Sequence, residues 1–216
     1  MRLDPAGLPF IGGALALAVV SGAAIGWMLA VPFAALGLFF AFFFRDPERT
    51  VPDAGHQVLA PADGRVLVAG AVQAGAAPAA ATTPAGSATW QQISIFLSPM
   101  NVHVNRIPVS GRITRVNYQP GRFLPAYHND AAAANERSEI WIDHHGETVV
   151  ARQIVGILAR RVVCRVQPGA DVRAGDRYGI MKFGSRMDIF VPSTARITVK
   201  VGETVRGGET VIAVLH

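Results

Sequence analysis

The sequence contains very little cysteine, lysine or charge, and each shortage excludes a class of protein. Cys164 is the single cysteine, which rules out an internal disulfide framework and cysteine-rich zinc sites. Lys182 and Lys200 are the only lysines among 20 basic residues, against 15 acidic ones. This arginine-rich balance suits an anionic partner such as phospholipid or nucleic acid, although a codon bias toward arginine explains it equally well.

Charge is absent altogether from residues 8–44, an apolar run of 37 residues. This is nearly twice the roughly 20 residues that cross a bilayer as a helix. The small residues of "SGAAIG" (21–26) interrupt the run, so we expect two helices joined by a tight turn. A cleaved signal peptide is the competing interpretation, but its apolar core is only about 7 to 15 residues long. We therefore predict a membrane-anchoring hairpin at 1–44 and a second domain at 45–216.

Arginines flank the run on both sides, with Arg2 before it and Arg45 and Arg49 after it. By the positive-inside rule both flanks prefer the cytoplasm. The pattern predicts a protein held at the cytoplasmic face of the cell membrane, by a hairpin that either spans the bilayer or dips into it.

After residue 57 the apolar residues alternate with period two, as in "VLAPADGRVLVAG", "QISIFLSP" and "EIWIDHHGETVVARQIVG". The last stretch predicts a β-hairpin at His145-Gly146. The fold class is therefore mainly β: a compact β domain preceded by an α-helical hairpin. The uncharged segment 69–89 between two of these strands is interpreted as a surface loop without chemical importance.

The C-terminal part contains an internal repeat, because "PGADVRAGDRYGIM" (168–181) aligns with "VGETVRGGETVIAV" (201–214). Two copies of one turn-and-strand unit predict two pseudo-symmetric halves that cover each other's apolar faces. These units resemble the biotinyl and lipoyl carrier sandwich, so part of the β domain is expected to have that form.

Three polar residues interrupt otherwise apolar strands: Asp63 in "APADGRV", His103 in "LSPMNVHVNRIP" and Ser185 in "KFGSRMDIFVP". An acid, a base and a hydroxyl on a β scaffold could meet as a triad. The G-x-S-x-G elbow of serine hydrolases is missing, however, so the Gly184-Ser185 pair needs another explanation.

With "PADG", "LSPMNVHVNRIPVSG", "NERSEI" and "FGS" in this order, residues 45–216 resemble the phosphatidylserine decarboxylase family, in its short bacterial and archaeal form. The resemblance implies cleavage of the chain between Gly184 and Ser185 into two chains that stay together as a heterodimer. It also implies conversion of Ser185 into a covalent pyruvoyl cofactor. This group then decarboxylates phosphatidylserine to phosphatidylethanolamine through a Schiff base.

The Gly-Ser pair has a physical reason of its own. A serine hydroxyl that attacks the preceding carbonyl needs a bent, uncrowded backbone, and Gly184 lacks the Cβ that would obstruct it. Among the catalytic residues, His103, oriented by Asp63, is the predicted base for the hydroxyl proton of Ser185.

The remaining candidates surround this chemistry. His128, Asn135, Glu136 and Arg137 are possible substrate-binding residues, although Glu136 and Arg137 could equally form a structural salt bridge. No metal site is predicted. Where many larger relatives of that family carry a second histidine, this chain has Arg106. Either His103 therefore acts in both self-cleavage and decarboxylation, or a water molecule takes its role in one of the two reactions.

Two other functions compete with this interpretation. Lys182 in "IMKFGS" is similar to the modified lysine of biotin carriers, which makes a membrane-tethered carrier or adaptor the main alternative. Nucleic-acid binding would cluster the arginines on one element, whereas they are scattered. We therefore expect membrane lipid and phosphatidylserine as partners and no nucleic acid; a homo-oligomer is possible.

Overall fold

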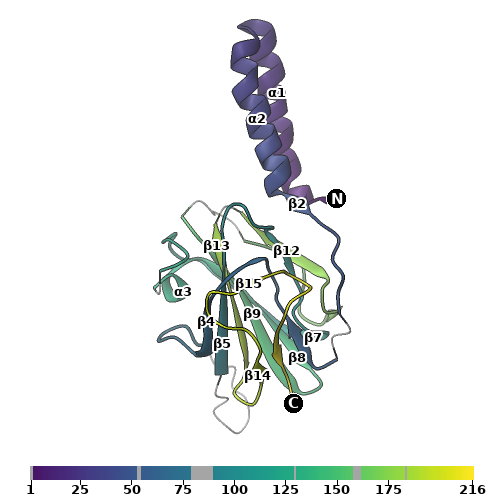
Figure 1. The fold of residues 1–216 in the computed structure, drawn as a ribbon, viewed down its shortest axis with the longest axis vertical. Coiled ribbons are helices and arrows are strands. Elements are labelled where there is room, and N and C mark those ends of the chain that lie inside the picture. Colours follow the sequence, from purple (N-terminus) through teal and green to yellow (C-terminus); the bar gives the residue numbers. More distant parts are fainter. Residues whose placement is uncertain (1, 53–54, 79–89, 129, 158–161, 183) are drawn as a thin grey trace. The chain divides into compact units, whose positions relative to one another are not determined.

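The structure is a computed structural model that describes residues 2–52, 55–78, 90–128, 130–157, 162–182 and 184–216 (Figure 1). The chain forms two compact units. The helical unit comprises Met1–Glu48 and Val102–Val104, and the β unit comprises Arg49–Asn101 and Asn105–His216.

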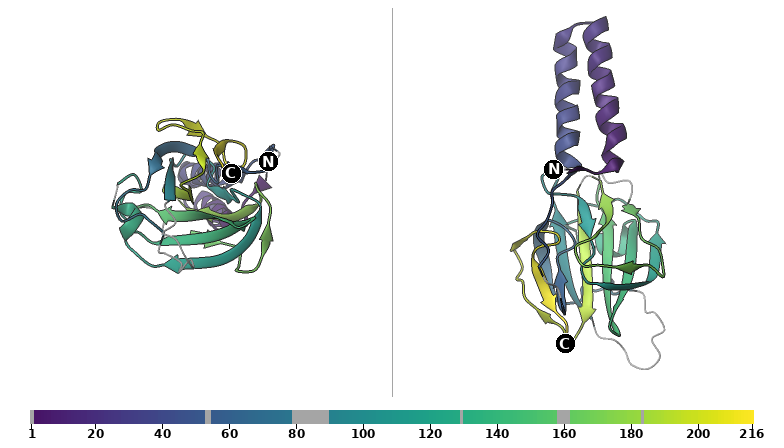
Figure 2. Two further views of the ribbon diagram at one scale, coloured as in Figure 1. Left: turned by 90° about the horizontal axis from the view of Figure 1, so that it is seen from below. Right: turned by 90° about the vertical axis from the view of Figure 1, so that its right-hand side faces the viewer.

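The helical unit is an antiparallel pair of apolar helices, as the interrupted apolar run predicted (Figures 1 and 2). A short turn, η1 (Pro5–Gly7), leads into α1 (Leu8–Ala24), and α2 (Trp27–Phe43) follows Gly26. Small residues let the helices approach closely: a Cβ at Gly22 would lie 3.2 Å from that of Ala30. Pro5–Ala24 is long and apolar enough to cross a membrane, and α2 is an apolar helix of 17 residues.

The ends of the hairpin are joined by a short strand pair, β1 (Arg2–Leu3) with β2 (Arg45–Asp46). Next to it the rings of Phe10 and Phe44 stack with 5.5 Å between their centroids. Arg45 lies over the ring of Phe42 and donates to the Phe42 carbonyl, which places a positive charge at the C-terminal end of α2.

The β unit is built on one antiparallel sheet of eight strands in the order β11-β7-β8-β9-β13-β5-β4-β15. Strand β13 lies inside this sheet, paired along its length with β5 and over six residues with β9. The predicted turn at His145-Gly146 is confirmed as the connection between β8 and β9. The strands are β4 (Gly64–Ala71), β5 (Trp90–Leu97), β7 (Gly111–Gln119), β8 (Arg137–His144), β9 (Glu147–Val155), β11 (Asp171–Val172), β13 (Ser185–Pro192) and β15 (Thr204–Val205).

Two further sheets have three strands each, in the orders β10-β12-β6 and β14-β16-β3. The prediction of a mainly β protein preceded by a helical hairpin is therefore confirmed; the β unit also holds a four-residue helix, α3 (Ala131–Ala134). The strands of the small sheets are β3 (Gln57–Leu59), β6 (Val104–Arg106), β10 (Val162–Cys164), β12 (Arg177–Met181), β14 (Arg196–Ile197) and β16 (Val211–Val214).

The two copies of the repeat adopt the same local structure. Each places glycines with positive φ before and after a two-residue strand: Gly169 and Gly175 around β11, and Gly202 and Gly208 around β15. Strands β11 and β15 form the opposite edges of the large sheet, and the strands that follow, β12 and β16, lie one in each small sheet. The repeat is thus built as a pair of equivalent strand units on the two sides of the fold.

The two faces of the large sheet differ in chemistry. Strand residues such as Ile95, Met187 and Ile189 point into the main hydrophobic core. On the other face Asp188 and Arg152 are paired neighbours, and both are buried. This second face contains a row of charged and polar side chains shielded from water.

Part of the segment 69–89 covers this polar face, contrary to the expectation of a loop without chemical importance. Residues 69–71 belong to β4, and Ala76 is fully buried. The Ala76 carbonyl accepts a hydrogen bond of 2.6 Å from Nη1 of Arg152. This role could not be predicted from the sequence, because the buried arginines lie far along the chain. Residues 79–89 lie outside the described part.

Candidate active site

Ser185 is the first residue of β13 and lies at the end of two ladders, opposite Leu97 of β5 and Val155 of β9. The residue is fully buried. Its Oγ has no hydrogen-bond partner among the described residues. Because an unpartnered buried hydroxyl costs about 1 to 3 kcal/mol, such a group suggests a function. Alternation along β13 places Ser185 on the core face, with Met187.

Gly184 has φ +72°, a conformation that favours glycine. A Cβ built on it would meet nothing within 4 Å, so glycine is required here by the backbone conformation and not by lack of space. Gly184 lines a predominantly apolar cavity of about 340 Å³, together with Phe96, Pro125 and Tyr127. The Gly-Ser peptide bond therefore combines a bent backbone, a buried hydroxyl and an adjacent apolar cavity.

Arg186, the next residue, is held by a buried polar network on the opposite face of the sheet. Its Nε donates to Oδ1 of Asp188 at 2.6 Å, and its Nη2 donates to Gln73 at 2.8 Å and to Ser94 at 2.9 Å. Gln92 donates to the second oxygen of Asp188 at 3.1 Å. Both members of the ion pair are almost fully buried. The start of β13 is thus fixed by side-chain contacts as well as by its two ladders.

Asn135 fastens the loop before α3 to the strand that pairs with Ser185. Its side chain accepts from the Leu124 amide at 2.9 Å and donates to the carbonyls of Leu124 and Val155, both at 2.8 Å. Glu136 is buried, and its backbone carbonyl accepts from the Val155 amide. The "NER" segment therefore contacts Val155, the residue paired with Ser185, through the Glu136 carbonyl and the Asn135 side chain.

Arg137 and His128 lie around this loop. Nη1 of Arg137 donates to the Ala133 carbonyl at 2.6 Å, and Nη2 donates to Gln119. Burial lowers the pKa of the Arg137 guanidinium, nearby Arg152 lowers it further, and Glu139 partly offsets both. His128 is exposed, with its ring 5.3 Å from that of Tyr127, which lines the cavity beside Gly184.

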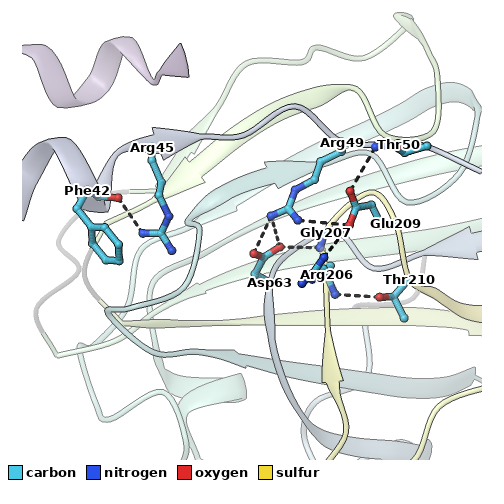
Figure 3. Close-up of polar contacts among 9 residues, drawn as sticks. All are labelled: Phe42, Arg45, Arg49, Thr50, Asp63, Arg206, Gly207, Glu209 and Thr210. Atoms are coloured by element: carbon cyan, nitrogen blue, oxygen red, sulfur yellow. Dashed lines mark hydrogen bonds and ion pairs between the residues drawn. The ribbon is translucent and has the colours of Figure 1, made fainter. Parts of the chain in front are cut away.

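Asp63 is held by an arginine and a backbone amide, as Figure 3 shows. Nη2 of Arg49 lies 2.7 and 2.9 Å from its two oxygens, and the Gly207 amide donates to Oδ1 at 2.8 Å. Arg49 also reaches Glu209 at 3.5 Å. Sequence reasoning predicted a partnership of Asp63 with histidine and missed this arginine, which stands in a linker without strand or helix pattern.

His103 belongs to the helical unit, where its ring lies 4.1 Å from that of Phe43 at the end of α2. It is fully buried. The short segment Val102–Val104 thus provides an imidazole next to the aromatic base of the hairpin. The orientation of His103 by Asp63 stays a prediction.

Of the predicted residues, the β unit brings Gly184, Ser185 and Asn135 together around Val155. Sequence reasoning missed Gly156, against which the Gly184 carbonyl packs, because this contact depends on strand register. Among the residues that the structure describes, no three His, Cys, Asp or Glu side chains are grouped as a metal site would require.

Comparison with known proteins gives a consistent result. The sequence profile of the family described as phosphatidylserine decarboxylase matches residues 36–213. The chain is 41% identical over 211 residues to the phosphatidylserine decarboxylase proenzyme of Nitrosomonas europaea, covering 97% of this chain and 94% of that protein. It is 44% identical over 212 residues to the proenzyme of Chlorobium phaeobacteroides, covering 98% and 90%.

Proposed function

Since this chain belongs to the phosphatidylserine decarboxylase family, we propose that it converts phosphatidylserine to phosphatidylethanolamine with a pyruvoyl group made from its own Ser185. The observation that carries the proposal is the buried, unpartnered Oγ of Ser185 directly after a glycine with φ +72°. A hydroxyl that only stabilised the fold would be expected to have a hydrogen-bond partner.

Self-cleavage needs no external reagent other than water. The Ser185 oxygen bonds to the Gly184 carbonyl carbon, the peptide C–N bond breaks, and the hydroxyl proton ends on the freed amine. Loss of the Ser185 α-proton then breaks the Cβ–O bond and releases Gly184 as a carboxylate. Tautomerisation of the dehydroalanine and hydrolysis of the imine give the pyruvoyl group and ammonia.

We assign His103 as the base that takes the hydroxyl proton, because imidazole accepts protons near neutral pH. Asp63 is proposed to orient it. Nη2 of Arg49 contacts both oxygens of Asp63 and keeps the carboxylate in one orientation, which supports a positioning role for it. The assignment of both residues otherwise rests on their sequence motifs.

The ketone of the pyruvoyl group would supply an electron sink when the substrate carboxyl group leaves as carbon dioxide. The buried start of β13 fits such a group, since residue 185 is held by two ladders and faces away from water. We propose that His128, Glu136 and Arg137 contribute to substrate binding. Asn135 is proposed to act through the loop that it holds, because its polar atoms are already hydrogen-bonded.

The helical hairpin is proposed to hold the enzyme at the cytoplasmic face of the membrane. A diacyl lipid stays in the bilayer, so the site must be brought to it. The long apolar segment Pro5–Ala24 and the arginines on both flanks of the hairpin support this placement. The mature protein is proposed to be a heterodimer of residues 1–184 and 185–216.

The test is mass spectrometry of the purified protein with a denaturing gel beside it. Wild type should give two chains, with the second blocked to Edman sequencing, and Ser185→Ala should stay whole and inactive. A free Ser185 amino terminus would indicate ordinary proteolysis. A full-length chain with added mass on Lys182 would indicate a carrier instead.

Asp63 is tested by Asp63→Asn, which should slow self-cleavage. Glu209→Gln is the matched control, because Glu209 contacts Arg49 without contacting Asp63. Equal rates for wild type and Asp63→Asn would remove Asp63 from the mechanism.

A further inference from the structure

Gly156 lies directly after β9, the strand that pairs with the start of β13. Because Ser185 is opposite Val155, the next position outward places Gly156 opposite Gly184. Two glycines therefore face each other on neighbouring strand ends, and one of them, Gly184, supplies the carbonyl group of the peptide bond that the proposed function breaks. Sequence spacing does not reveal this pair, since the two residues are far apart in the chain.

The Gly184 carbonyl oxygen occupies the volume that a side chain at position 156 would fill. A Cβ built on Gly156 would lie 2.2 Å from this oxygen and 3.1 Å from the carbonyl carbon, and Cβ contacts below 3.0 Å essentially never occur. The φ angle of Gly156 lies outside the left-handed region. Glycine is therefore required at 156 by space, whereas Gly184 is required by conformation.

The direction of this contact matters for the chemistry. A Cβ points out of the plane of a sheet, and alternation along β9 puts that of residue 156 on the face of Ile154. The Ser185 side chain lies on the other face, with Met187. The scissile carbonyl oxygen therefore lies toward the face of the sheet that holds Ile154, whereas the Ser185 side chain lies on the opposite face. A nucleophile attacks a carbonyl carbon from a direction away from its oxygen.

We propose that Gly156 is a positioning residue for self-cleavage: its missing side chain admits the Gly184 carbonyl oxygen and so presents the carbonyl carbon to Ser185 Oγ. The inference rests on the proposed self-processing of the chain. Gly156 supplies no polar group and acts only through the scissile carbonyl. A methyl group at this position forces the oxygen away and turns the carbon from the hydroxyl.

The test is the rate of self-cleavage of Gly156→Ala, followed on denaturing gels after a pulse of synthesis. We expect cleavage at least tenfold slower than in wild type. Hydroxylamine, which cleaves esters, should release no fragment from the accumulated precursor, because the block precedes the ester. The matched control is Gly179→Ala in β12, whose Cβ would lie 2.3 Å from the Val163 carbonyl oxygen and 2.8 Å from Nε2 of Gln153, and would not meet the Gly184 carbonyl. Gly179→Ala should cleave at nearly the wild-type rate.

Stability is measured separately from cleavage by placing both glycine substitutions in the Ser185→Ala chain, which cannot be cut, and comparing melting temperatures. Similar melting temperatures with slow cleavage only in Gly156→Ala would support the proposal. Wild-type cleavage by Gly156→Ala would overturn it. Equal slowing by both substitutions would also overturn it, since a general loss of stability would then explain the effect.

A second variant covers the case in which Gly156→Ala does not fold. The Ala126 Cβ lies 3.4 Å from the Cβ built on Gly156, on the loop side of the cavity beside Gly184. Ala126→Val adds methyl groups next to the space that the Gly184 carbonyl oxygen occupies without altering β9, and it should slow cleavage several-fold. Wild-type cleavage by this variant, with Gly156→Ala unfolded, would overturn the proposal. Failure of wild type itself to cleave would instead contradict the proposed function.

Discussion

The helical unit and the β unit differ in which side chains they expose to solvent: the helical unit exposes large apolar side chains, and the β unit buries charged ones. Along the hairpin, large apolar side chains such as Trp27 and Met28 are about three-quarters exposed, at 75% and 76%. In the β unit, Arg186 and Asp188 are 1% and 0% exposed. In an aqueous protein both arrangements would be unfavourable. The exposed apolar side chains of the hairpin support the proposed contact with a membrane, whereas the β unit keeps its charges in place by pairing them.

The contrast does not reduce the helical unit to an anchor, because His103 belongs to that unit. His103→Ala should slow self-cleavage by about two to four orders of magnitude, the usual contribution of a positioned base. The rate is measured on denaturing gels as precursor disappears. The exposed His56 provides the control, and His56→Ala should cleave normally. An unchanged cleavage rate in His103→Ala would show that the helical unit contributes no base to self-cleavage, and anchoring would be its only proposed role.

Charges placed on the hairpin test the anchor without disturbing the aromatic base near His103. Leu17 and Val31 are exposed on α1 and α2. An aspartate costs about 2.5 to 3.5 kcal/mol at the centre of a membrane helix, where Leu17 lies, so Leu17→Asp alone should lower activity on bilayer phosphatidylserine by about 100-fold. Adding Val31→Asp, nearer the start of α2, should lower it further. Activity on a soluble short-chain analogue should persist. Val201→Asp, on the β unit, is the control; equal losses on both substrates would contradict an anchoring role.

The buried charges of the β unit are tested by breaking one pair. Asp188→Ala leaves Arg186 buried without its carboxylate and should lower the free energy of unfolding by about 3 to 5 kcal/mol. Urea denaturation in the uncleavable Ser185→Ala chain measures this. The double change of Arg186→Met with Asp188→Leu should recover most of the stability, because no charge is then stranded. A loss below about 1 kcal/mol for Asp188→Ala would show that water reaches the pair.

The smallest effect concerns alkaline pH. Burial raises the pKa of the Tyr178 hydroxyl well above its ordinary value. The unfolded chain then loses this proton first, at about pH 10, so stability is full below pH 10 and falls above it by up to about 1.4 kcal/mol per pH unit. Tyr178→Phe should flatten this decline in denaturation curves at pH 9 to 11. Tyr118→Phe, at an exposed tyrosine, should leave the decline unchanged.

Local patterns predicted the parts of the fold whose causes are local. The uncharged run 8–44 predicted two helices, the Gly146 turn predicted the β8–β9 hairpin, and the repeated glycines predicted equivalent strand units. The Gly184-Ser185 pair was also identified from neighbouring residues. Strand register was not predictable, because it depends on pairing between distant segments. The contact of Gly156 with Gly184 and the pairing of Arg49 with Asp63 therefore emerged only in three dimensions.

The interior position of β13 has a consequence for the lifetime of the protein. After cleavage before Ser185, β13 would still be hydrogen-bonded to β5 and β9, so the two chains would stay together without a covalent link. The reverse path would be closed, because a chain that has lost its Gly-Ser linkage cannot regain it after unfolding. Maturation would then be irreversible. The lifetime of the active enzyme would be set by its rate of unfolding, that is by kinetic stability, rather than by an equilibrium between folded and unfolded forms.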